Sequence, residues 1–178
     1  MANLVDQYQA LARYNAWMNG RLYEGADRLS DAERRRDAGA FFRSIHGTLN
    51  HLLLTDRAWL WRFTGDRRVA ESRDAAGKPI AMTGRLDQVL YADFEELRRE
   101  RARTDADLTA FTAALTPERL DTDISYRTTA GVEQRHVLWW AVSHFFNHQT
   151  HHRGQVTTLL KQAGVDPGVT DLIAFLRA

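Results

Sequence analysis

The 178-residue sequence contains no cysteine. This absence excludes disulfide bonds, cysteine-containing zinc sites, iron–sulfur clusters and a protein thiol acting as a nucleophile. Proline is rare as well, with three residues, and 44% of the residues are hydrophobic, which is typical of a compact soluble protein. We expect residues 1–178 to form a single domain whose core needs neither disulfides nor oligomerisation for stability.

An excess of charge of one sign is also missing. The 24 basic and 23 acidic residues give a formal net charge of +1, whereas nucleic-acid-binding proteins usually concentrate Lys and Arg on one face. We therefore expect no nucleic-acid partner. No run of about 18 apolar residues occurs, so no membrane-spanning segment is predicted. The segment Met1–Gln7 lacks the basic start and apolar core of a signal peptide, which makes the cytoplasm the expected location.

Four long segments carry apolar residues at helical spacings of three and four. They predict helices over roughly 4–29, 40–63, 86–115 and 136–162, with a tail helix near 170–176. Ser30–Glu33 has the form of a capping box, and Thr116–Glu118 also fits a short helical turn. The segments 124–127 and 132–134, on either side of Thr128–Gly131, predict a small hairpin. The expected fold is all-α, an up-down four-helix bundle with this hairpin before the fourth long helix.

The stretch 64–85 contains three glycines and a proline among charged residues. This composition predicts a long surface loop. Loops of this length inside a compact domain are often functional.

Four of the seven histidines lie within one short segment of the fourth long helix. They are His144, His148, His151 and His152. Side chains four positions apart lie one turn above each other, so two imidazoles can bind one metal ion. With Phe145 at the centre of the apolar stripe, His152 and His148 fall about 20° and about 60° away, toward the core. His144 and His151 lie about 100–120° away, at the edge or on the surface.

A single inward histidine is most simply a core residue satisfied by a hydrogen bond. For two inward histidines one turn apart, two interpretations are equally supported: ordinary core histidines and a metal site. A metal site needs a further ligand, and His51 lies at the border of the apolar stripe of the 40–63 helix. Its neighbours on that face are small, which leaves space for an ion or merely allows two helices to approach closely. They are Ser44, Thr48, Thr55 and Ala58.

The remaining polar candidates have less distinctive positions. His46 points away from the stripe and is expected to be exposed, and His136 is expected to begin the fourth helix as a structural or solvated residue. Asp56 falls within the apolar stripe and needs a partner, because unpaired burial of a carboxylate is costly. It could orient a ligating imidazole, or bond to an arginine or a backbone amide of a neighbouring helix.

Other catalytic motifs are missing from the sequence. No HExxH, P-loop, GxGxxG or GxSxG pattern occurs. Glu133 and His136 have Glu-x-x-His spacing, but no second copy exists, which disfavours a di-iron bundle site.

Three segments resemble the DinB/YfiT-like family, a bacterial group regarded as metalloenzymes and distinct from the DNA polymerase that shares the DinB name. They are Arg13–Asn19, Leu49–Leu60 and Asn147–Gln155, and their order and separation match over nearly the whole chain. The resemblance implies a four-helix bundle, often a homodimer, that holds one divalent metal ion through three histidines. Carried over by position these are His51, His148 and His152, the same residues that the helical periodicity favours.

Two functions remain as alternatives at this point. Three neutral imidazoles leave an ion with open positions, as in catalytic sites, and some relatives are thiol S-transferases while others look like hydrolases. We therefore expect a metal-dependent enzyme of one of these types, acting on a small-molecule substrate. Any thiol must come from a low-molecular-weight cosubstrate, and Arg153 or the 64–85 loop could bind an anionic part of it.

The alternative is a non-catalytic metal-binding bundle of the stress-response or ligand-sensing kind, because no general acid or base is evident beside the ligands. Imidazole suits zinc, nickel, iron and copper, so the sequence does not select the metal, and Zn, Ni or Fe is expected.

Overall fold

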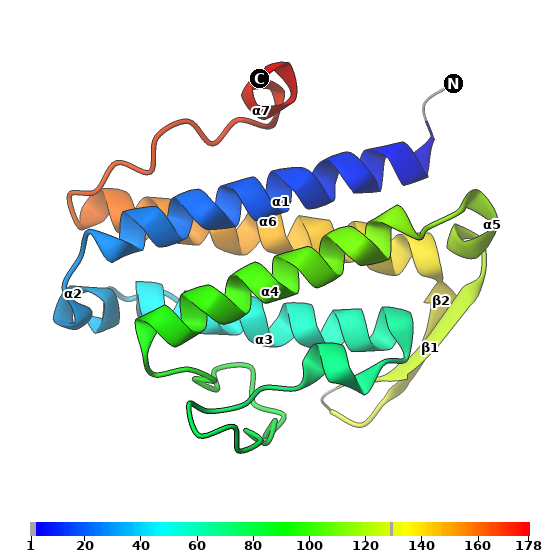
Figure 1. The fold of residues 1–178 in the computed structure, drawn as a ribbon, viewed down its shortest axis with the longest axis horizontal. Coiled ribbons are helices and arrows are strands. Elements are labelled where there is room, and N and C mark those ends of the chain that lie inside the picture. The colour runs from blue at the N-terminus through cyan, green and yellow to red at the C-terminus, as the bar shows by residue number, and fades with distance from the viewer. Residues whose placement is uncertain (1–2, 129) are drawn as a thin grey trace.

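The computed structural model describes residues 3–128 and 130–178, and within them the chain is mainly helical (Figure 1). The four long helices are α1 (Leu4–Asp27), α3 (Ile45–Thr64), α4 (Phe94–Ala113) and α6 (Leu138–Gln162). The short ones are α2 (Asp31–Arg35), η1 (Arg67–Ala70), α5 (Pro117–Leu120) and α7 (Leu172–Arg177). The expectation of a helical protein with a capping box at Ser30–Glu33 is confirmed.

The long helices do not alternate in direction as the up-down arrangement requires. Asp56 and Phe63 of α3 contact Arg101 and Phe111 of α4, so residue numbers rise together and the two helices run parallel. Helices α1 and α6 are also parallel to each other and run opposite to that pair (Figure 1). The alternating order is therefore wrong at the step from α3 to α4, where the long segment 65–93 returns the chain along the molecule before α4 begins.

Helix α3 begins five residues later than its apolar pattern suggests. Ser44 caps it by accepting a hydrogen bond from the Gly47 amide. Arg43, just before Ser44, has a φ of 66°, which is incompatible with a right-handed helix, so the helix cannot begin earlier. Its far end is closed by Gly65 in the left-handed conformation. The turn before α3 therefore folds back along the helix, which matters for the site below.

Helices α4 and α6 also start later than expected. Asp93 accepts a hydrogen bond from the Glu96 amide and starts α4 at Phe94, so the apolar residues from 86 to 91 belong to a loop. The strands β1 (Asp123–Arg127) and β2 (Glu133–Val137) form the expected antiparallel hairpin, although Thr129 in its turn lies outside the described residues. His136 belongs to β2 and does not begin α6.

Buried polar residues form a layer across the middle of the molecule, between two hydrophobic clusters. This polar layer consists of Asn15, Asp56, Arg101, Asp105, Gln149 and Arg153. Asp56 accepts hydrogen bonds from Arg101 at 2.6 Å and from Gln149, and Asp105 accepts one from Asn15 at 3.1 Å. Sliding one long helix would leave buried charges unpaired, which is costly. The layer therefore helps to fix the register that the site needs.

None of the helices in the described residues combines the length and the hydropathy needed to cross a bilayer. Met1 and Ala2, which formed part of the reasoning on a signal peptide, lie outside those residues.

Candidate metal centre

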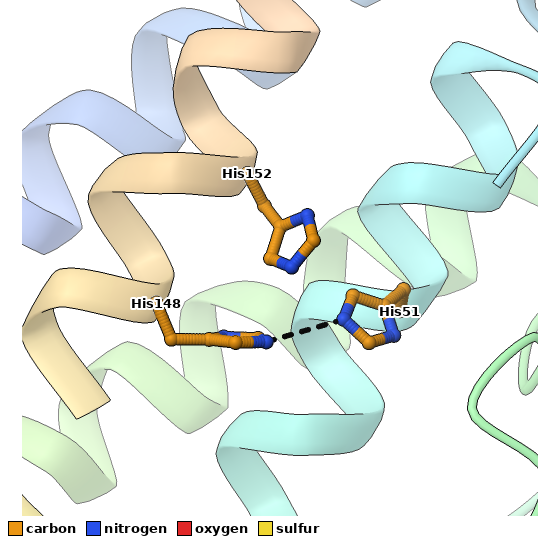
Figure 2. A group of neighbouring side chains, drawn as sticks. All are labelled: His51, His148 and His152. Carbon is orange, nitrogen blue, oxygen red and sulfur yellow. Dashed lines mark hydrogen bonds between the residues drawn. The ribbon is translucent and has the colours of Figure 1, made fainter. Parts of the chain in front are cut away.

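Three histidine side chains from two helices point toward one another (Figure 2). Each of His51, His148 and His152 offers one ring nitrogen, and these nitrogens all lie within 4.8 Å of one another. The Nε2 atoms of His51 and His148 are 3.3 Å apart. His51 and His152 are buried, and His148 is half-buried. A group with these spacings could hold one metal ion.

The geometry follows from helix spacing and from the antiparallel packing of α3 on α6. His148 and His152 are one turn apart on α6, and their ring centroids lie 4.4 Å apart. Helix α3 passes beside them, so that the ring of His51 is 4.6 Å from that of His152 and 5.2 Å from that of His148. Spacing on one helix and close packing of another thus bring the three rings together.

Two of the three rings are fixed from outside by hydrogen bonds. The Nδ1 atom of His51 lies 2.8 Å from the carbonyl oxygen of Leu86, and that of His152 lies 2.8 Å from Oε1 of Gln155. Both oxygens only accept hydrogen bonds, so Nδ1 carries the proton in each ring and Nε2 keeps its lone pair. Oxygen partners of this kind orient imidazoles that bind metals.

The rings are neutral near pH 7. Burial lowers the pKa of His148 to about 3, and the neighbouring His152 and His51 act in the same direction. Burial also lowers the pKa of His51 to about 4 and lowers that of His152. Since only the neutral imidazole has a free lone pair, all three are in the form that a metal ligand requires.

Phe42 closes one side of the site. Its ring stacks on His51 with centroids 3.7 Å apart and planes inclined by 18°, and it lies 5.5 Å from the ring of His152. The turn that carries Phe42 runs against the first turn of α3, where Gly47 has no side chain. A Cβ at Gly47 would overlap the carbonyl oxygen of Phe42, so glycine permits this approach.

The site adjoins an open cavity of about 330 Å³, which His51 and His148 line and Phe42 does not. Most of its remaining wall comes from α3 and from the segment after it, with Tyr126 of β1. His144 also lines it from α6. Three imidazoles beside an open cavity are typical of catalytic metal sites, which keep a position free for substrate.

The helical periodicity placed most histidines correctly. His144 and His151 are exposed, as expected. His46 is buried instead, with 2% of its surface exposed, and bonds to the carbonyl oxygen of Tyr91 at 2.9 Å. The expectation of an exposed His46 was wrong because Tyr91 belongs to the long loop, which covers this face of α3.

Of the two alternatives for Asp56, the arginine partner is the one observed. Its carboxylate pairs with Arg101 and accepts from Gln149 in the polar layer. Arg153 also belongs to that layer, where its guanidinium contacts Asn15 and lies 5.2 Å from the Tyr14 ring. It does not line the cavity. The 64–85 loop does, through Met82, Gly84 and Arg85.

Sequence reasoning missed Gln155, Leu86 and Phe42. Gln155 follows His152 by three positions on one helix, a spacing that could have identified it. The carbonyl of Leu86 and the ring of Phe42 are brought in by non-local folding, and no sequence pattern marks them.

The comparisons with known proteins identify the family of the chain. The model of the DinB family matches residues 1–178. Protein DinB from Bacillus subtilis (strain 168) is 24% identical over 167 residues, which cover 93% of this chain and 91% of that protein. The match extends over the whole chain, including both helices that carry the three histidines. The chain therefore belongs to the DinB family.

Proposed function

We propose that His51, His148 and His152 bind one divalent metal ion and that the protein is a metal-dependent enzyme. The observation that carries this proposal is the convergence of three neutral imidazoles, with ring nitrogens within 4.8 Å of one another, beside an open cavity. A divalent ion held in this way supplies Lewis acidity to a nucleophile that binds in its open position. The donor set suits zinc, nickel or iron.

His144 is the candidate proton acceptor. It lines the cavity, and its ring centroid is 6.0 Å from that of His148 and 5.3 Å from that of Trp59. Partial burial of this otherwise exposed side chain lowers its pKa, and the charges of His136 and Arg62 act in the same direction. The ring is therefore neutral near pH 7 and able to accept a proton from a nucleophile bound in the cavity.

Thiol transfer fits the cavity better than hydrolysis. Zinc hydrolases of the HExxH type use a glutamate as general base for water, whereas no carboxylate of the described residues lines this cavity. A thiol is a stronger acid than water and needs less help to ionise. Because the chain has no cysteine, the thiol would belong to a small-molecule cosubstrate.

A panel of thiol-transfer and hydrolase assays on the zinc- and nickel-loaded protein tests the proposal. We expect activity in the thiol-transfer panel, loss of it in His148→Ala, and little change in Gln162→Ala, which alters an exposed residue at the end of the same helix. Activity in neither panel would leave a non-catalytic metal-binding or ligand-sensing protein. Equal activity in His148→Ala would exclude the metal-dependent mechanism.

A further inference from the structure

We propose that the cavity beside the three histidines binds a small organic carboxylate with an apolar body, and that Arg62 binds its carboxylate group. This inference deepens the proposed function by naming the class of substrate. The inference rests on the proposed function only where it concerns the reaction of the bound molecule. Binding of the carboxylate does not depend on that function, because Arg62 is not one of the three histidines.

The walls of the cavity are suited to an apolar molecule. Trp59, Tyr126, Met82 and Leu86 all line it. Its volume of about 330 Å³ is within the usual range for small-molecule sites, which are mostly apolar with a few well-placed polar groups. The polar groups therefore decide which ligands fit.

Positive charge dominates those polar groups. Arg62 and Arg85 both line the cavity, and none of the described residues in its wall is acidic. Arg85 is largely neutralised, because it pairs with Asp87 at 2.7 Å and 72% of its side chain is exposed. Arg62 has no carboxylate partner among the described residues, and its hydrogen-bond partner is the Arg127 carbonyl oxygen, 3.4 Å away.

The guanidinium of Arg62 is held in place by two aromatic rings. It lies 4.7 Å from the ring centroid of Trp59 and 4.7 Å from that of Tyr126. Stacking of this kind restrains the planar group, and the N–H donors that do not bond to the Arg127 carbonyl remain at the edge, where they match the two oxygens of a carboxylate. The side chain is half-buried, so an ion pair formed there is less screened than one on the surface.

The position of Arg62 also orients the ligand. Its guanidinium lies over Trp59, whose ring is 5.3 Å from that of His144, and the His144 ring is in turn 6.0 Å from that of His148. A molecule held by its carboxylate at Arg62 therefore extends its other end toward His148 and His51, which line the same cavity. Anion and reacting group would be at opposite ends of the substrate.

Titration calorimetry with 3-phenylpropionate and its neutral analogue 3-phenylpropionamide tests this site. Both are measured on zinc-loaded and on EDTA-treated protein. We expect the acid to bind at least ten-fold more tightly than the amide in both samples. Arg62→Gln should remove that preference, and Arg62→Lys should keep part of it, because the charge remains while the planar fork is lost.

Arg67→Gln is the matched control. Arg67 is an exposed arginine that also lies over a tryptophan ring, 5.6 Å from that of Trp61, but it does not line the cavity. We expect it to keep the full preference. Equal affinity for acid and amide, no binding of the acid, or an unchanged preference in Arg62→Gln would overturn the inference. Should Arg62→Gln fail to fold, an undiminished preference in Arg62→Lys overturns it instead.

The two samples separate this inference from the proposed function. A preference that disappears with EDTA and is unaffected by Arg62→Gln would mean that the carboxylate binds the metal, which contradicts the inference and supports the function. A preference for the acid that depends on Arg62, in a protein that binds no zinc, would support the inference and contradict the proposed function.

Discussion

The ring of Phe42 stacks on the imidazole of His51, with centroids 3.7 Å apart. This contact joins the turn before α3 to the candidate metal centre. It covers one face of the His51 ring, the one ring of the three that comes from α3, and restrains its position. The turn can lie this close to α3 because Gly47 has no side chain.

Gly47→Ala should therefore displace the turn that carries Phe42. We expect the free energy of unfolding to fall by about 1–3 kcal/mol, the usual cost of overpacking, and zinc affinity to fall as well. Urea unfolding and zinc titration measure the two effects. Gly20→Ala is the control, because a Cβ at Gly20 on α1 meets nothing within 4 Å, and alanine favours a helix. Stability and affinity unchanged in Gly47→Ala would contradict this role.

Gln155 orients the ring of His152 through Oε1. Replacing it with alanine removes the acceptor while the ligand itself stays, and losing such a partner typically reduces metal affinity about 10–100-fold. A competition titration with a zinc chelator measures the change. Gln162→Ala alters an exposed glutamine of the same helix and should leave the affinity as it is. Equal affinities in the two variants would show that Gln155 does not support the site.

The low pKa of His148 predicts a specific pH dependence in metal-free protein. The value is about 3 in the folded state and about 6.5 in an unfolded chain, so the unfolded chain takes up a proton first as the pH falls. Any stability associated with the neutral ring is complete above about pH 6.5 and is lost as the pH falls toward the folded-state pKa.

His148→Gln lacks this titration. We expect the stability of the wild type relative to His148→Gln to decrease between pH 6.5 and pH 4, because the titrating groups that do not interact with His148 cancel in the difference. Urea unfolding in EDTA at a series of pH values gives that difference. A constant difference over the range would mean that the ring is not buried as described.

We expect Asp56 to stabilise the fold and to have no part in metal binding. Asp56→Ala would leave Arg101 buried beside only one carboxylate, that of Asp105. Breaking a buried pair in this way costs about 3–5 kcal/mol, which urea unfolding would detect. We expect one zinc per chain to remain at temperatures where the variant is folded. Asp31→Ala, which removes an exposed partner of Arg35, should change little. Loss of zinc in folded Asp56→Ala would instead assign Asp56 to the site.

The periodicity of α6 was sufficient to predict that His148 and His152 point toward the core, because both histidines and the apolar stripe belong to one helix and follow its geometry. His51 was selected on weaker grounds, from the small residues around it and from the family resemblance. The burial of His46 was missed because it depends on Tyr91, which is distant in sequence. The parallel course of α3 and α4 was also missed, since a loop of the length of 65–93 permits either direction.

Direct metal analysis tests the central claim, that the three imidazoles share one ion. Protein purified without an affinity tag, and the matched His51→Ala variant, would be measured by elemental analysis after equilibration with zinc, nickel or iron and removal of unbound metal. We predict one metal ion per chain in the wild type and none in His51→Ala, with both proteins folded. Wild type that takes up no metal, or His51→Ala that holds a full equivalent, would contradict the account.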